Sequence, residues 1–158
     1  MVLSNPTYND GMARTALEGY KSGNLTLILF KPNSTPQGTW AYYIENTHGC
    51  NGYLRNTSAA DGDEARWLAY LDVGTYMIQL TCGKDSDYGI VDVEIDGVAL
   101  ASFDCYAAAP DPQSTTRDLD NVVATSGVKQ IDLKVNGKNG SSTGYKCNLS
   151  CLEIRRQT

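Results

Sequence analysis

The most regular pattern in the chain is an alternation of apolar and polar residues that fits β-strands. Residues 90–95 read IVDVEI, with apolar side chains at every second position and acidic ones between them. Alternate side chains of a strand point to opposite faces, so one face of this segment is apolar and the other acidic. Asp96-Gly97 supplies the positive φ angles of a two-residue turn. The pattern therefore predicts a hairpin with its return strand over 98–106.

Short apolar or alternating runs recur along the rest of the chain and predict further strands. The loop over 32–38 and the connection over 107–116, with its two prolines, are too rich in strand-breaking residues to be strands. About eight strands at this spacing are typical of an all-β fold, a two-sheet antiparallel β-sandwich of jelly-roll type. The remaining predicted strands are 25–30, 40–45, 53–55, 66–71, 76–82, 128–135 and 145–155.

The first 24 residues show no sustained period and contain the turn signals Asn5-Pro6 and Asn9-Asp10-Gly11. We interpret 1–24 as an N-terminal arm, or as a strand added from outside the main fold. The sandwich domain is predicted to span 25–158.

Composition narrows the possible partners. The 158 residues are 41% hydrophobic and 20% charged, with a net charge of −5, so a nucleic-acid partner is not expected. No apolar run is long enough to insert into a membrane, and the first residues lack the features of an export signal.

Five cysteines leave one thiol over if all others pair. Strand phase places Cys82, Cys105, Cys147 and Cys151 on core-facing positions, where free thiols behave as small apolar groups. A disulfide framework is the alternative, but a chain of this length does not need one. Cys50 lies in a glycine-rich loop and is expected to be exposed.

Candidate catalytic and metal-binding groups are few. His48 stands alone on a loop, and no nucleophile or cofactor motif occurs, so we expect no enzyme activity and no cofactor. Asp92 and Glu94 have the spacing of a glycosidase pair, but we interpret them as part of a solvated strand face beside the Asp96-Gly97 turn.

Two acidic loops offer calcium ligands but lack EF-hand spacing, and we interpret them as hydrated loops. The zinc alternative, His48 beside Cys50, lacks further ligands nearby. We therefore predict no metal site. The acidic residues concerned are Asp61, Asp63, Glu64, Asp85 and Asp87.

Aromatic side chains are the main candidates for ligand contact. Exposed rings stack on sugar faces or form subunit interfaces, whereas buried ones pack in the core. The candidate ligand-binding residues are Trp40, Tyr42, Tyr43, Trp67, Tyr70 and Tyr88.

A longer pattern runs through most of residues 66–155. It consists of a G-x-Y strand at 74–80, the hairpin over 87–97, the F-D-x-Y segment 103–106, the strand opening at 126–133, and the polar loop 138–145. This pattern resembles the jelly-roll domains of phage and viral virion proteins, such as tail-fibre tips, head fibres and decoration proteins. Those domains are in turn similar to carbohydrate-binding modules.

The resemblance implies a non-enzymatic protein of the virion surface, assembled in the host cytoplasm. It also implies a homotrimer that contacts other virion proteins and a host-surface glycan. The alternative is a free-standing carbohydrate-binding module or lectin. A glycan-active enzyme that uses Asp92 or Glu94 is a third, weaker hypothesis.

Overall fold

A computed structural model describes residues 24–28, 32–44 and 52–157. These residues form eleven strands, and none of them lies in a helix that is able to span a membrane. The strands are β1 (Asn24–Ile28), β2 (Ser34–Gln37), β3 (Trp40–Tyr43), β4 (Tyr53–Asn56), β5 (Glu64–Leu71), β6 (Gly74–Lys84), β7 (Ile90–Ile95), β8 (Val98–Asp104), β9 (Asp111–Val123), β10 (Gly127–Val135) and β11 (Asn148–Arg156).

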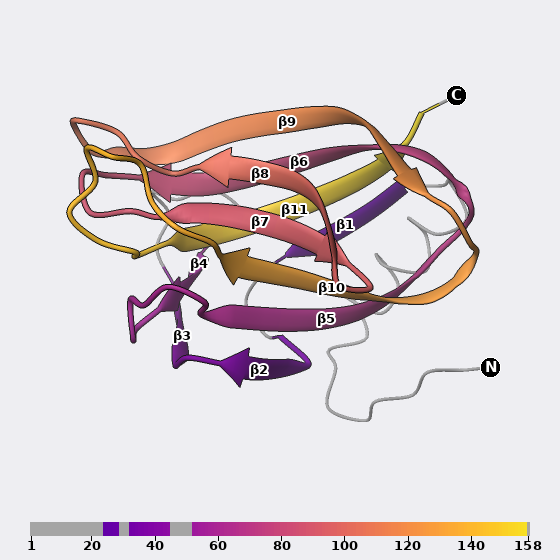
Figure 1. The fold of residues 1–158 in the computed structure, drawn as a ribbon, viewed down its shortest axis with the longest axis horizontal. Coiled ribbons are helices and arrows are strands. Elements are labelled where there is room, and N and C mark those ends of the chain that lie inside the picture. Colours follow the sequence, from indigo (N-terminus) through magenta and orange to yellow (C-terminus); the bar gives the residue numbers. More distant parts are fainter. Residues whose placement is uncertain (1–23, 29–31, 45–51, 158) are drawn as a thin grey trace.

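The strands form two antiparallel sheets that pack face to face (Figure 1). One sheet has the order β3-β4-β11-β6-β9, and β1 pairs with β11 beyond the end of β4. The other sheet has the order β2-β5-β10-β7-β8. The predicted all-β, two-sheet jelly-roll sandwich is therefore confirmed.

The core fills the space between the sheets. A row of inward-facing residues crosses the second sheet, where Ile131 on β10 pairs with Trp67 on β5 and with Ile95 on β7. The facing sheet contributes the largest fully buried side chains of β4, β6 and β11. These are Leu54, Ile78, Leu80, Leu149, Leu152 and Ile154.

Two segments predicted as connections are strands. Residues 34–37 pair with β5, and residues 111–123 pair with β6 over almost their full length. Both strands lie at a sheet edge, where one row of backbone groups needs no partner. An edge tolerates Pro36 and Pro112 for that reason, so proline did not exclude strands here.

The predicted burial of four cysteines is confirmed, and all four are free thiols in the structure. The predicted phase is wrong for Cys151. The register shifts by one residue between Leu149 and Cys151, so Leu149 and Leu152 both face the core while Cys151 faces the opposite side of the sheet. Cys50 lies outside the described residues.

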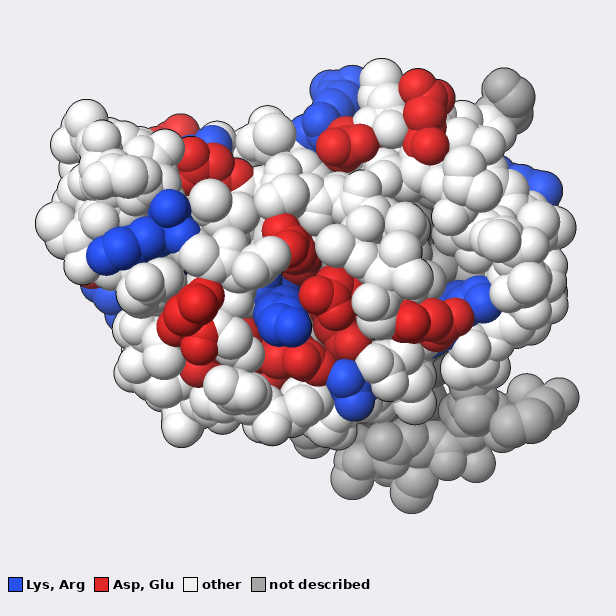
Figure 2. All heavy atoms as spheres, viewed as in Figure 1, with Lys and Arg blue, Asp and Glu red and all other residues white. Residues whose placement is uncertain are grey.

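The outer face of the second sheet carries a network of charged residues. Arg66 on β5 donates to both carboxylate oxygens of its cross-strand partner Asp132 and also to Glu64. On the neighbouring strands, Lys134 lies 3.8 Å from Glu94. Figure 2 shows acidic and basic side chains interleaved across the middle of this face.

Candidate functional site

The six predicted aromatic residues do not form one site. Trp67 is only 4% exposed and packs in the core beside Ile131, so its ring is not accessible to a ligand. Tyr88 is also buried in the core, and burial raises the pKa of its hydroxyl. Tyr70 lies on the outer face of β5 opposite Val128, away from β3.

The three other aromatic residues lie on the edge strand β3. Trp40 packs against the core and donates its indole N–H to the carbonyl of Gln37. Tyr42 is 38% exposed. The Tyr43 ring stacks on its cross-strand partner Tyr53, with the ring centroids 5.2 Å apart. Tyr42 is therefore the most exposed of the three aromatic residues on β3.

Arg55 stabilises the stacked pair. Its guanidinium carbon lies 4.9 Å from the centroid of the Tyr43 ring and 5.0 Å from that of Tyr53. The same side chain donates to Asn148 Oδ1 at 2.7 Å. Because these contacts cover the rings, we interpret the cluster as a structural element of the sheet.

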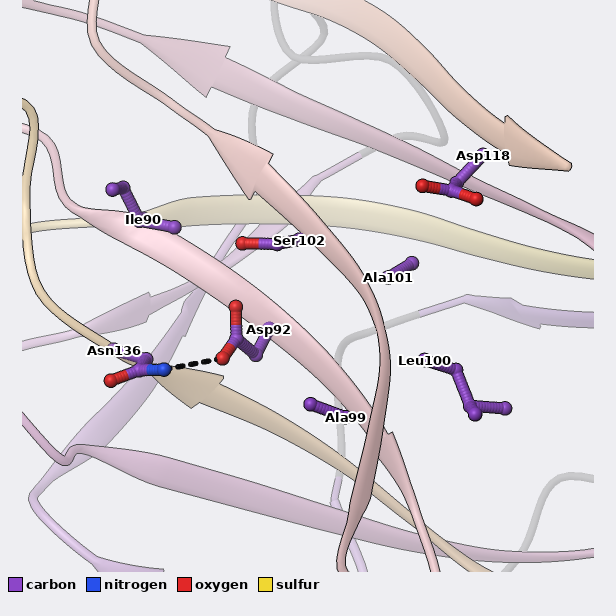
Figure 3. Close-up of a pocket in the computed structure, with 8 residues that line it drawn as sticks. All are labelled: Ile90, Asp92, Ala99, Leu100, Ala101, Ser102, Asp118 and Asn136. Carbon is purple, nitrogen blue, oxygen red and sulfur yellow. Dashed lines mark hydrogen bonds between the residues drawn. The ribbon is translucent and has the colours of Figure 1, made fainter.

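A shallow groove lies over β8 and is the candidate site. Its volume is about 440 Å³. It reaches from the outer face of β7, across β8, to β9 at the edge of the opposite sheet. In Figure 3, Asp92 and Asn136 lie to one side of β8 and Asp118 to the other. The lining residues are Ile90, Asp92, Ala99, Leu100, Ala101, Ser102, Asp118 and Asn136.

Irregular pairing and small residues shape the groove. The register between β7 and β8 shifts by one residue at Val93/Glu94, so that Leu100 is an extra residue on β8. Beyond this bulge, Ser102 is the cross-strand partner of Asp92. The short side chains of Ala99 and Ser102 leave room above the strand (Figure 3).

The central polar group of the groove is the Asp92 carboxylate. Asp92 is 5% exposed, so the solvated strand face predicted for it is wrong. Asn136 Nδ2 donates to Asp92 Oδ2 at 2.5 Å. Among the described residues, no side chain donates to Asp92 Oδ1, which points away from Asn136 in Figure 3. The groove thus holds a fixed carboxylate with one oxygen free to accept a hydrogen bond.

Backbone hydrogen bonds position Asn136. It follows the last residue of β10, and its own N–H donates to the carbonyl of Ile90 at 2.9 Å. The N–H of Ile90 donates in return to the carbonyl of Gly137 at 3.0 Å. Gly137 has a φ of 80°, which a side chain would disfavour. This turn fixes the amide of Asn136 over the start of β7.

The charge of the groove is negative. Two of its lining residues are carboxylates, Asp92 and Asp118, and none is basic. Lys134 is the cross-strand partner of Asp92 on β10, and its ammonium group lies 3.8 Å from Glu94. The groove can therefore accept hydrogen bonds through the carboxylates and donate them through the amide of Asn136 and the hydroxyl of Ser102.

The acidic loops are tied to protein donors. Asp63 is 1% exposed, and its Oδ2 accepts from Asn56 Nδ2, Ser58 Oγ and the N–H of Ala60, all within 2.9 Å. Asp61 accepts from the N–H of Gly137. No cluster of three metal-ligating side chains occurs in the described part of the chain.

In the other acidic loop, Lys146 donates to Asp87, and the carboxylate of Asp85 accepts from the backbone N–H of Ser86. The zinc alternative involved His48 and Cys50, which lie outside the described residues.

Sequence comparison gives no match, either to a family model or to a curated protein. Structural comparison gives many. Paenibacillus xanthan lyase matches with a TM-score of 0.65 and 20% identity over 82% of this chain, which is 12% of the lyase.

Two further matches are to whole modules. The CBM36-1 domain of a multidomain xylanase, from the hindgut metagenome of Trinervitermes trinervoides, has a TM-score of 0.61 and 17% identity, with 85% of this chain and 98% of that domain covered. A carbohydrate-binding module CBM36 in complex with calcium and xylotriose has a TM-score of 0.63 and 16% identity, with 82% and 98% covered.

The chain has the jelly-roll fold of carbohydrate-binding modules. The part of the sequence resemblance that concerned these modules is therefore correct at the level of fold. The virion-surface role and the homotrimer find no support in these comparisons.

The sequence pointed to only one of the polar groove residues, Asp92, as half of a possible glycosidase pair. Ser102 lies within the predicted strand 98–106, and Asn136 and Asp118 were assigned no role. Asp92 and Asn136 are 44 positions apart in the chain. Only the pairing of β10 with β7 brings them together, so no local pattern was able to reveal them.

Proposed function

We propose that this domain is a carbohydrate-binding module without catalytic activity, and that the groove over β8 holds a segment of a glycan chain. The observation that carries the proposal is the Asp92 carboxylate, which Asn136 fixes in an open groove with one oxygen free. The fold, shared with modules that span the same length, supports it.

The chemistry of the groove suits a sugar. Each hydroxyl of a sugar both donates and accepts, and Asp92, Asn136 and Ser102 offer both kinds of partner within one site. Ile90, Ala99 and Leu100 add apolar surface for the C–H face of a ring. The groove is shallow and open over β8 (Figure 3). One sugar unit of a polysaccharide can therefore lie in it while the adjoining sugar units stay outside.

The charge of the groove selects among glycans. A uronic acid would bring a third carboxylate beside Asp92 and Asp118, and like charges at short range disfavour binding. A neutral sugar avoids this repulsion, and a protonated amino sugar adds an attraction. We therefore propose that the ligand is a neutral or amino-bearing polysaccharide.

The acids are not arranged for hydrolysis. Asp92 accepts a hydrogen bond from Asn136, and Glu94 faces Lys134 on the neighbouring strand. Only Asp92 of the two lines the groove. A glycosidase needs both carboxyl groups at one glycosidic bond, and the absence of Glu94 from the groove lining speaks against this pair acting there.

Affinity electrophoresis tests the proposal. The protein runs through native gels that contain xylan, mixed-linkage glucan, mannan, chitosan or polygalacturonate. We expect at least one of the first four to retard the wild type and polygalacturonate not to retard it. Asn136→Ala should migrate as in a gel without glycan. Migration unaffected by all five polymers, or retardation by polygalacturonate alone, would contradict the proposal.

A further inference from the structure

Two buried thiols from different sheets lie in contact. Cys82 is on the core-facing side of β6, and Cys105 directly follows β8 in the opposite sheet. Their Sγ atoms are 3.5 Å apart. Among the described residues, a third core thiol, Cys147, lies in the same cluster of buried side chains.

The backbone on both sides of the pair is held in place. The N–H of Asp85 donates to the carbonyl of Cys105 at 3.2 Å, and the N–H of Ala107 donates to the carbonyl of Asp85 at 3.2 Å. The N–H of Cys105 donates to the carbonyl of Gly89 at 3.1 Å. The segment after β6 and the segment after β8 therefore stay adjacent, and the contact between the thiols is built into the fold.

We propose that Cys82 and Cys105 form a disulfide that links the two sheets when the domain folds in the presence of a small-molecule disulfide. An S–S bond is about 2.0 Å long, so the two sulfurs need to approach by roughly 1.5 Å. Rotation about the side-chain bonds supplies part of this movement. The proposal does not depend on the glycan-binding function.

The chemistry is thiol–disulfide exchange. One of the two cysteines, as its thiolate, attacks the small disulfide, forming a mixed disulfide and releasing one small thiol. The sulfur of the other cysteine, as its proton leaves to solvent, then attacks the protein sulfur of the mixed disulfide and releases the second small thiol. Two protein thiols are oxidised and one disulfide is reduced to two thiols, so electrons and protons balance.

In the closed domain the two thiols differ in acidity. A hydrogen bond from Cys105 lowers the pKa of the Cys82 thiol against the effect of burial. The same hydrogen bond and burial raise the pKa of the Cys105 thiol. This difference holds only where the two sulfurs are in contact, so either cysteine can make the first attack in the open domain.

Burial sets the time at which the bond forms. The exposed fractions of Cys82 and Cys105 are 1% and 0%, so a dissolved oxidant does not reach them in the folded domain. Exchange takes place while the sheets close or when the domain opens. A protein folded under reducing conditions should therefore keep both thiols free, which is their state in the structure.

To test the proposal, the protein is refolded from denaturant in a buffer of oxidised and reduced glutathione. The remaining free thiols are then alkylated under denaturing conditions, and the protein is digested with trypsin and mapped without reductant. Trypsin separates the relevant cysteines, because Cys82 falls in fragment 67–84, Cys105 in 85–117, and Cys147 and Cys151 together in 147–155. We expect fragments 67–84 and 85–117 to be joined. The same map after reductant should show them apart.

Variants identify the pair. Cys105→Ala should abolish the cross-linked fragment, whereas Cys147→Ala, a matched change in the same cluster, should leave it intact. The cross-link closes a loop between residues 23 positions apart, so reduction should lower Tm by roughly 5–15 °C. All five cysteines alkylated in refolded wild type, or Cys82 or Cys105 joined to a different fragment, would overturn the proposal.

Discussion

Asn136 Nδ2 donates to Asp92 Oδ2 at 2.5 Å and thereby fixes the carboxylate of a residue that is only 5% exposed. The carboxylate is not a solvated surface group, and it is not a fully paired core group either, because its Oδ1 has no donor among the described side chains. A ligand hydroxyl that donates to Oδ1 completes its hydrogen bonding without rearrangement of the protein. This preorganisation is the physical basis of the proposed glycan site.

Asn136→Ala is predicted to weaken glycan binding about tenfold or more. The variant removes the amide that orients Asp92 and one potential donor to the ligand, and loss of a hydrogen bond to a charged group costs about 1.5–3 kcal/mol. Isothermal titration with an oligosaccharide of the polymer that retards the wild type measures the change.

Glu94→Gln is the matched control for that measurement. Glu94 faces outward on the same strand but does not line the groove. The affinity of Glu94→Gln for the glycan should stay within about twofold of the wild-type affinity, because a change outside the binding site contributes little to binding. If both variants lost the same affinity for the glycan, the effect would come from the net charge of the whole outer face of the sheet and not from contacts in the groove.

Wild-type protein is predicted to release no reducing ends from any polysaccharide that it binds. Asp92 and Glu94 each have a neighbouring side-chain partner, and only Asp92 lines the groove. A reducing-sugar assay with long incubation measures this. Cleavage that Asp92→Asn or Glu94→Gln abolishes would establish the enzyme hypothesis instead.

Asp96 in the β7–β8 turn is predicted to make stability depend on pH in the acid range. Its carboxylate accepts from the N–H of Gln130 and from Lys129 Nζ, both at 2.9 Å, and these bonds lower its pKa. A carboxyl whose pKa is lower in the folded state contributes stability above its unfolded pKa of about 3.9, and this contribution is lost as pH falls through the folded pKa.

Asp96→Asn tests this dependence. Asparagine tolerates the φ of 53° at this position and still accepts from Gln130, but it leaves the ammonium group of Lys129 without its counter-charge. Urea unfolding should show a loss of up to about 1 kcal/mol at pH 7, because solvent screens this half-exposed ion pair. The difference from wild type should shrink as pH falls below about 4. If the difference in unfolding free energy between variant and wild type were as large at pH 3 as at pH 7, the loss would come from the geometry of the turn and not from the charge of Asp96.

Asn56→Ala is predicted to cost about 2–4 kcal/mol of unfolding free energy. Asn56 is fully buried, donates to Asp63 Oδ2 and the carbonyl of Tyr145, and accepts from the N–H of Cys147. The variant leaves these buried groups with fewer partners. Denaturant unfolding measures the loss, and Thr57→Ala, on an exposed neighbouring side chain, is the control with an expected loss below 1 kcal/mol.

The sequence predicted the fold well wherever one strand face is buried and the other is polar. β7 and β10 alternate because each covers the core on one side only, so their bounds follow from the pattern. The apolar–polar pattern did not predict β9, because β9 is an edge strand whose residues are mostly exposed. Even Thr116 and Asp118, which lie on the same sheet face as the buried Leu80 and Ile78 of β6, are polar. Hydrophobic periodicity does not report a strand of this kind.

The site was harder to predict than the fold. Aromatic residues are a composition signal, and the structure places Trp67 and Tyr88 in the core. The groove instead depends on Asn136 and Asp92, which meet through strand pairing, and on the bulge at Leu100. Whether a strand forms a bulge depends on how its side chains pack against distant parts of the chain. The residues next to the bulge in the sequence do not by themselves reveal those contacts.

NMR mapping of the glycan on the domain decides whether the groove over β8 is the binding site. Backbone amide shifts are followed while an oligosaccharide of the bound polymer is titrated into labelled protein. We expect the largest changes in 90–92, 99–102 and 136–137, which surround Asp92 and Asn136. Changes centred on the Tyr42 edge of β3, or no changes at a saturating concentration of glycan, would contradict it.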